Sequence, residues 1–154
     1  MRAHAEPSSE HDRREARLAF EALAARQAAV HRSAAQAEAL LEAAERVGAV
    51  AGERDSTETA AATTADAAFR RCLADAARVP MLRESLDLLA EHSPARPIRL
   101  AAVAYAQLAE AVHAADPDDA ERAVRELHQA EWTLQRREVL GRLPRPGASE
   151  HRPA

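Results

Sequence analysis

The chain has 154 residues, which allows one globular domain, and its hydrophobic fraction of 47% is mostly alanine while aromatic residues are only 3%, so an all-α fold is expected. The formal net charge is −4, and all 21 basic residues are arginines scattered among Asp and Glu, which argues against the basic stripe of a nucleic-acid-binding surface. The single Cys72 excludes an internal disulfide and a Cys-based zinc site, and the polar N-terminus and the lack of a long apolar run favour a cytoplasmic protein without a signal peptide or membrane span.

The hydrophobic periodicity predicts an antiparallel bundle of about six helices between residues 9 and 140. Residues 1–8 are expected to be a disordered lead-in, and residues 141–154 a disordered tail. The predicted helices cover residues 9–31, 34–47, 61–78, 80–91, 97–115 and 117–140.

Local signals set the predicted helix boundaries. Ser33 is expected to cap the second helix together with Gln36, as a capping box, and Asp116 is expected to cap the sixth. The glycines within residues 48–58 predict a loop, and the two prolines within residues 93–97 predict a break. The apolar side chains expected to line the core are Leu40, Leu41, Ala44, Val47, Leu100, Ala104, Leu108, Ala111, Ala120, Val124, Leu127, Ala130 and Leu134.

The segment 64–82 says most about function. Asp66, Phe69 and Arg70 lie on neighbouring turns of one predicted helix, and Pro80 opens the next. The segment resembles the signature of the FCD domain, the effector-binding C-terminal half of FadR-type GntR transcription regulators, which runs D-x-x-F-H, then a small-residue turn, then N-P-x-L. The Asp, Phe, Pro and Leu of that signature are present, whereas Arg70 replaces its His and Val79 its Asn.

The resemblance continues, in order, over most of the chain. The family's first helix resembles E-x-R-x-x-x-E-x-x-A-A, and its later helices resemble H-x-x-I-x-x-A-I and A-x-x-x-M-x-x-H. The corresponding residues here are Glu15, Arg17, Glu21, Ala24, Ala25, Tyr105, Leu108, Ala111, Val112, Asp116, Ala120, Val124 and Leu127. The resemblance implies a homodimeric sensor of a small organic acid. The family's winged helix is missing from the pattern, so DNA would be reached only through such a domain on another chain or in upstream sequence.

The resemblance also implies a divalent metal held by one Asp and three His. Asp66 stands at the Asp position, but Arg70, Tyr105 and Leu127 stand at the His positions. His128 follows directly, yet a helix turns by about 100° per residue, so we expect it to point away from the face of Leu127. With one of four ligands retained, we expect no metal cofactor.

Four residues are predicted to bind the ligand: Asp66, Arg70, Tyr105 and Arg17. Arg70 either forms a simple i,i+4 ion pair with Asp66 or holds a carboxylate where the metal would stand. Tyr105 is expected to be a core aromatic whose hydroxyl is hydrogen-bonded, and it is also able to donate to an effector. Arg17 either faces the pocket, as the resemblance implies, or is a solvated residue that pairs with Glu21.

Other readings of the sequence are a helical protein-interaction module without a ligand and, more remotely, a ferritin-like metal enzyme. The enzyme reading depends on Glu110 and His113, the only E-x-x-H pair, whereas di-iron bundles need two such pairs. No catalytic triad, phosphate loop or paired carboxylates are present, so no enzyme is predicted. Phe69 and Trp132 are expected to be packing residues, and Cys72 a small buried side chain.

Overall fold

The computed structural model describes residues 9–53 and 59–143, and these residues form six helices and no strand. The all-α bundle predicted from the sequence is therefore confirmed. The predicted disorder of residues 1–8, and of the tail beyond residue 143, lies outside the described residues. The helices are α1 Glu10–His31, α2 Ala34–Ala51, α3 Ala60–Ala77, α4 Pro80–Glu91, α5 Ile98–His113 and α6 Pro117–Arg142.

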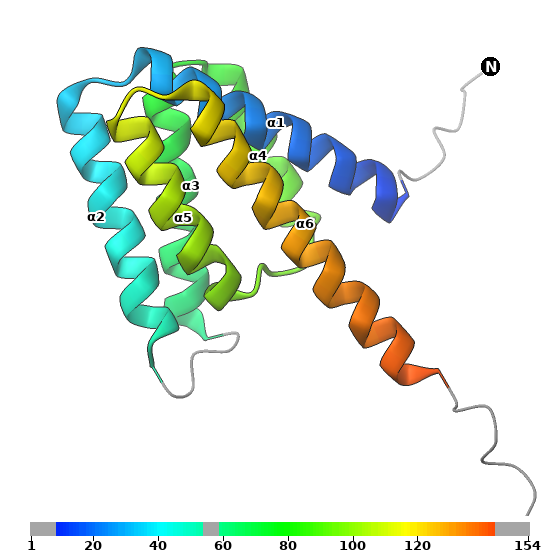
Figure 1. Ribbon diagram of the computed structural model, residues 1–154. Helices are drawn as coiled ribbons and strands as arrows, with labels where there is room; N and C mark the ends of the chain where they lie inside the picture. The colour runs from blue at the N-terminus through cyan, green and yellow to red at the C-terminus, as the bar shows by residue number, and fades with distance from the viewer. Residues whose placement is uncertain (1–8, 54–58, 144–154) are drawn as a thin grey trace, which may run out of the picture.

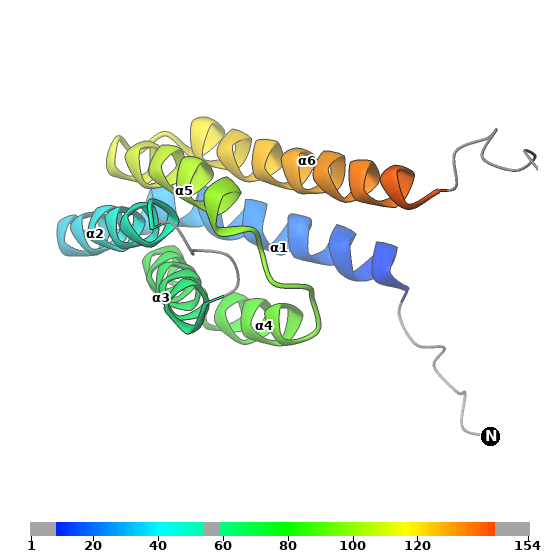
Figure 2. The same cartoon turned by 90° about the horizontal axis from the view of Figure 1, so that it is seen from below.

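The helices pack as a layered bundle in which α2 lies against α3 and α5, while α1 lies against α3 and α6 (Figure 1). Figure 2 shows α1 and α6 side by side along one edge, and the C-terminal part of α6 reaches beyond the other helices. No helix within the described ranges is both long and apolar enough to cross a membrane.

Alanine dominates the buried core, so the helices approach closely and a few larger side chains fill the space between them. The largest fully buried side chains are Phe69, Leu40, Val47 and Val112. Phe69 is the only aromatic ring among these four, and it stacks on the buried ring of Tyr105.

Capping residues start the helices where the sequence predicts. The Ser33 side chain accepts a hydrogen bond from the Gln36 backbone N–H, and the Gln36 side chain accepts one from Ser33 N, which completes the capping box. Asp116 accepts hydrogen bonds from the backbone N–H groups of Asp118 and Asp119 at the start of α6. Arg78 closes α3 in the left-handed region, with φ 56°, so that Pro80 can begin α4 directly.

Two predicted ends were placed too early. Helix α2 continues through Gly48 to Ala51, and α6 passes Gly141 to end at Arg142. An isolated helical glycine costs only about 1 kcal/mol relative to alanine, so these two glycines do not stop the helices. A Cβ atom added at Gly48 or Gly141 would meet nothing within 4 Å, which places both glycines on open faces.

Several predictions of buried side chains are wrong. Trp132 is 41% exposed and Leu134 is 37% exposed, although Glu131 and Gln135 on the same turns of α6 contact Arg96 and α1. The Arg136 guanidinium lies over the Trp132 ring, 5.3 Å from its centroid, and covers part of it. Cys72 is half-buried rather than buried. Leu41, Leu100 and Ala130 are also only partly buried.

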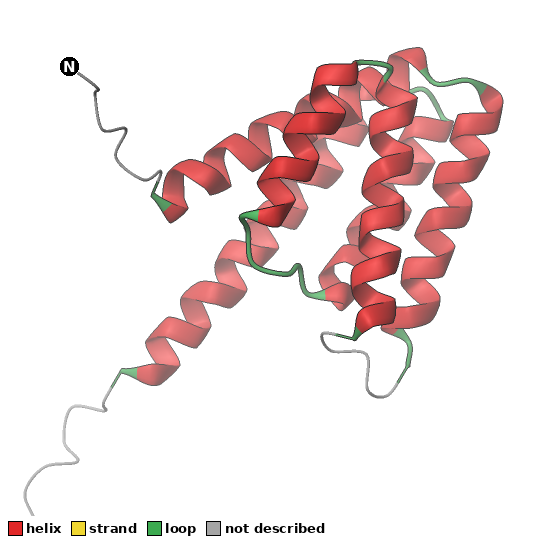
Figure 3. Cartoon of the chain, turned by 180° about the vertical axis from the view of Figure 1, so that it is seen from behind, coloured by secondary structure: helices red, strands yellow, loops and turns green. Residues whose placement is uncertain are grey.

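The connection between α4 and α5, residues Ser93–Pro97, is an extended loop (Figure 3). Both prolines of this α4–α5 connection lack a backbone N–H, which prevents the two helices from merging into one. Arg96, in this loop, contacts the buried side chains of Glu21 and Tyr105, and we call this group of polar side chains the polar centre.

Candidate functional site

The polar centre begins on α3 with Asp66. The Arg70 Nε atom donates a hydrogen bond to Asp66 Oδ2 at 3.1 Å, and the Tyr105 hydroxyl donates to Asp66 Oδ1 at 2.6 Å. Both carboxylate oxygens are therefore occupied by protein donors. Arg70 and Asp66 are partly buried, with side chains 15% and 17% exposed.

Tyr105, on α5, is positioned by the core. Its ring is 2% exposed and stacks on Phe69, with the ring centroids 3.8 Å apart and the planes within 6° of parallel. Burial raises the pKa of the Tyr105 phenol, and Asp66 adds to the rise against the opposing effect of Arg96. The phenol therefore stays protonated and donates to Asp66, as the sequence predicts for a buried tyrosine.

Arg96 lies at the centre of the polar groups, and its side chain is only 1% exposed. Its Nη1 donates to the Tyr105 hydroxyl at 2.9 Å, its Nη2 donates to Glu21 Oε2 at 2.9 Å, and its Nε donates to Glu131. His128 Nε2 lies 3.4 Å from Arg96 Nη2. Burial opposes the charge, but Glu21, Tyr105 and Glu131 hold the pKa of Arg96 well above its usual value.

Glu21, on α1, joins three donors and is 4% exposed. Arg17 Nε donates to Glu21 Oε1 at 2.9 Å, while His128 Nε2 lies 2.6 Å from Glu21 Oε2, the oxygen that Arg96 also contacts. Burial alone would raise the pKa of Glu21, but Arg96, the hydrogen bond from His128 and the charge of Arg17 hold this pKa well below its usual value. Glu21 is therefore a carboxylate inside the bundle.

We predict that Glu21→Gln makes stability less dependent on acid. A folded-state pKa below the ordinary 4.5 gives stability that is fully present above that pH and is lost as the pH falls through the folded-state pKa. The wild-type chain should therefore lose stability between about pH 5 and about pH 3, and Glu21→Gln should lose less, as measured by urea unfolding at both pH values. Glu15→Gln, an exposed change on the same helix, should behave as the wild type. An equal loss in Glu21→Gln and the wild type would contradict this.

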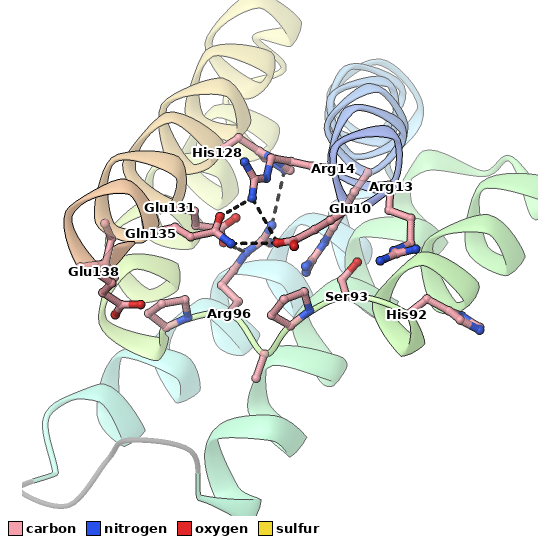
Figure 4. A pocket seen from close by; sticks show the side chains of 15 residues that line it. Glu10, Arg13, Arg14, His92, Ser93, Arg96, His128, Glu131, Gln135 and Glu138 are labelled. Carbon is pink, nitrogen blue, oxygen red and sulfur yellow. Dashed lines mark hydrogen bonds and ion pairs between the residues drawn. The ribbon is translucent and has the colours of Figure 1, made fainter. Parts of the chain in front are cut away.

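Two cavities adjoin the polar centre, and the α4–α5 connection lines both. The α3 cavity, of about 590 Å³, is lined by Arg17, Asp66, Arg70, Arg96 and Arg99 among others. The α1–α6 cavity, of about 300 Å³, lies between the ends of these two helices and the connection. In Figure 4, Arg14, Glu10 and Gln135 form a chain of polar contacts between α1 and α6 across this cavity.

Comparison with protein families matches residues 12–130 to the FCD domain. The chain belongs to the FCD family. A search among curated proteins gives no significant match. FCD domains are the effector-binding domains of GntR-family regulators and are regulatory rather than catalytic. The match starts in α1 and ends within α6, so it includes α2 to α5 completely and the residues of the polar centre other than Glu131.

The predicted site residues of this FCD domain lie together. Arg17, Asp66 and Arg70 line the α3 cavity. Tyr105 does not line it but donates a hydrogen bond to Asp66. Arg17 pairs with Glu21, as one of the two alternatives predicted, but it is buried rather than solvated. Their role in binding a ligand stays a prediction.

His128 was placed incorrectly. Both Leu127 and His128 are buried, and His128 contacts Glu21 on α1. Because α6 packs against both α1 and α5, its buried face is wide enough to include two consecutive residues. Arg96 and Glu131 also belong to the site, and neither was predicted from the sequence. The sequence signal that could have indicated Arg96 is its position between two prolines in the predicted break.

The residues present do not fit the metal that the FCD resemblance implies. At the four ligand positions, Asp66 has both oxygens engaged by Arg70 and Tyr105, and Leu127 has no donor atom. Two guanidinium groups, of Arg70 and Arg96, stand within this polar centre and would repel a divalent cation. Among the described residues, no group of three His, Cys, Asp or Glu side chains is placed to bind one metal ion.

The E-x-x-H pair lies away from this centre. Glu110 and His113 are exposed on α5, and His113 lies 3.3 Å from Glu38 of α2. The pair is part of the solvated surface of the bundle.

Proposed function

We propose that this FCD domain is the effector-sensing and dimerisation domain of a FadR-type GntR regulator, and that it binds a small organic acid in the α3 cavity without a metal. The observation that carries the proposal is the presence of two arginines on different helices, Arg17 and Arg70, in the lining of one cavity. Each is fixed by a hydrogen bond from its Nε to an internal carboxylate.

This arrangement suits a carboxylate. Among the described residues, Glu21 is the only polar partner of Arg17, and Asp66 is the only one of Arg70. The two terminal nitrogens of each guanidinium are therefore available to a ligand, and these nitrogens can bind a carboxylate by two parallel hydrogen bonds. The Nε bonds hold the arginines in place before binding, which lowers the entropy cost of binding.

The cavity also has an apolar part, to which Ala62, Ile98, Leu100 and Leu134 contribute. Sites for small molecules typically combine an apolar lining with a few polar groups that orient the ligand. The lining therefore favours an organic acid with a carbon skeleton over an inorganic anion.

The proposal extends to the partners. We infer that the domain forms a homodimer in the cytoplasm, and that ligand binding changes the packing of its helices. The dimer would transmit this change to winged-helix domains, which are supplied by another chain or by sequence upstream of this one.

A helical interaction module without a ligand is the alternative, and one observation favours it. The C-terminal half of α6, together with the residue that follows the helix, leaves Trp132, Val139, Leu140 and Leu143 between 41% and 59% exposed. Exposed apolar side chains are able to pack against another protein. In that case, carboxylic acids would leave the stability of the chain unchanged.

A thermal-shift screen with acetate, lactate, succinate and benzoate tests the proposal. We expect at least one acid to raise the melting temperature, because a ligand at a hundred times its Kd adds about 2.7 kcal/mol to the stability of the folded state. In Arg70→Ala this rise should disappear, whereas Arg71→Ala, an exposed change at the next position of α3, should keep it. The proposal fails if no acid stabilises the wild-type chain, or if Arg70→Ala responds as the wild type does.

A further inference from the structure

Two chains of hydrogen bonds lead from Arg96 to the arginines of the α3 cavity. In the first, Arg96 donates to the Tyr105 hydroxyl, Tyr105 donates to Asp66, and Asp66 accepts from Arg70 Nε, at distances of 2.9, 2.6 and 3.1 Å. Arg96 therefore fixes the Tyr105 hydroxyl, this hydroxyl fixes the Asp66 carboxylate, and the carboxylate orients Arg70. The direction of the Arg70 guanidinium therefore depends on Arg96 through two intermediates.

The second chain is shorter. Arg96 Nη2 donates to one oxygen of Glu21 at 2.9 Å, and the other oxygen accepts from Arg17 Nε at the same distance. A carboxylate held at one oxygen has its second oxygen fixed as well, because the group is planar. Arg96 thereby sets the orientation of Arg17 through a single residue.

Arg96 carries the largest part of the charge balance among the arginines and carboxylates of the polar centre, where His128 also lies 2.6 Å from Glu21. The cluster contains three cations and three carboxylates, and Arg96 is the cation that contacts two of the carboxylates, Glu21 and Glu131. Without it, two arginines would remain for three acids in a partly buried space. The three cations of the cluster are Arg17, Arg70 and Arg96, and its three carboxylates are Glu21, Asp66 and Glu131.

Arg96 also attaches the α4–α5 connection to the bundle. Ser93 bonds only within α4, to the carbonyl groups of Leu89 and Ala90, and the two prolines have no N–H to donate. Among the described residues, Arg96 makes the only side-chain hydrogen bonds that join this connection to α1, α5 and α6. Because the connection lines both cavities, Arg96 also holds their shared wall in place.

We propose that Arg96 is the positioning residue of the effector site: it orients Arg17 through Glu21 and Arg70 through Tyr105 and Asp66, and it is the internal cation of a cluster whose residues do not fit the family's metal. This inference rests on the proposed function, since it concerns the arginines that would bind the acid. Glu21, Glu131 and Tyr105 take three of the five N–H donors of Arg96, so we assign it the role of orienting the other two arginines, although it also lines the α3 cavity.

Nitrogen-15 NMR of the arginine Nε–H groups tests this without any ligand. In the wild-type chain, the Nε–H signals of Arg17 and Arg70, assigned from Arg17→Lys and Arg70→Lys, should exchange slowly with water. In Arg96→Met both signals should shift and exchange about tenfold faster or more, because a charge-assisted hydrogen bond is lost upstream of each. The Nε–H of Arg125, which donates to Glu121 outside the cluster, is the internal control.

Two further variants separate positioning from a general loosening of the fold. Tyr105→Phe keeps the ring stacked on Phe69 but cuts the first chain, so it should change the Arg70 signal and leave the Arg17 signal unchanged. Arg96→Lys keeps the charge but not the planar fork, so it should fold even where Arg96→Met does not, and still alter at least one of the two signals.

The proposal is overturned if both signals are unchanged in a folded Arg96 variant, or if Tyr105→Phe alters the Arg17 signal as strongly as the Arg70 signal. Fast exchange of both signals in the wild-type chain would also overturn it. None of these readouts needs an acid, so a failure of acids to bind counts against the proposed function alone.

Discussion

Replacing Arg96 with methionine should lower the free energy of unfolding by about 3–5 kcal/mol, the usual cost of removing one partner from a buried ion pair. The side chain is 1% exposed and contacts two carboxylates, Glu21 and Glu131, and the Tyr105 hydroxyl. Methionine fills much of the volume but donates no hydrogen bond, so a buried carboxylate loses a cation. Urea unfolding followed by circular dichroism at 222 nm measures the loss.

Arg99→Met is the matched control. Arg99 lies three residues further along, is exposed, and forms no ion pair among the described residues, so its replacement should change stability by no more than about 0.5 kcal/mol. If Arg96→Met lowers the free energy of unfolding as little as the control does, solvent solvates the carboxylates that Arg96 leaves unpaired.

A double-mutant cycle then isolates the interaction. If Arg96 and Glu21 stabilise each other directly, the variant that combines Arg96→Met with Glu21→Gln should lose less than the sum of the two single losses. Additive losses would mean that Arg96 acts on the fold independently of Glu21.

The helices were predictable because their signals are local. Ser33 with Gln36, Pro80 and Asp116 each act within a few residues of the helix they begin, so a single sequence contains the whole interaction. The end of α2 was predicted too early at Gly48. A glycine weakens a helix only slightly, and the tertiary packing of Val47 and its neighbours keeps this part of the chain helical.

Only the part of the site that depends on local contacts could be predicted from the sequence. Asp66 and Arg70 are four residues apart on one helix, so their contact follows from the sequence. The partners of Arg96 on α1 and α6 lie 75 and 35 residues away along the chain, and no local pattern encodes such contacts. His128 was misplaced because the prediction gave α6 one apolar stripe, whereas α6 packs on two neighbours.

Replacing Phe69 with alanine should destabilise the domain by about 3–5 kcal/mol, as other buried phenylalanines do when truncated. The ring is fully buried and is surrounded by a core made mostly of alanine. Alanine side chains have no rotamers with which to fill a cavity, so the space left by the ring should stay largely open and the loss should fall in the upper part of this range.

The same change should reach the polar centre. The Tyr105 ring would lose its stacking partner, and the hydroxyl that donates to Asp66 would no longer be held at 2.6 Å. We therefore expect Phe69→Ala to weaken the binding of acids as well as the fold, whereas Phe69→Leu, which leaves a smaller cavity, should lose less of both.

The other phenylalanine supplies the control. Phe20 is 36% exposed on α1, so Phe20→Ala should cost clearly less than Phe69→Ala. Unfolding must be followed by circular dichroism, because the only tryptophan, Trp132, is 41% exposed on α6 and reports poorly on the core. If Phe69→Ala costs no more than Phe20→Ala, the alanine-rich core is able to collapse around the lost ring, and Tyr105 is held mainly by its hydrogen bonds to Arg96 and Asp66 instead.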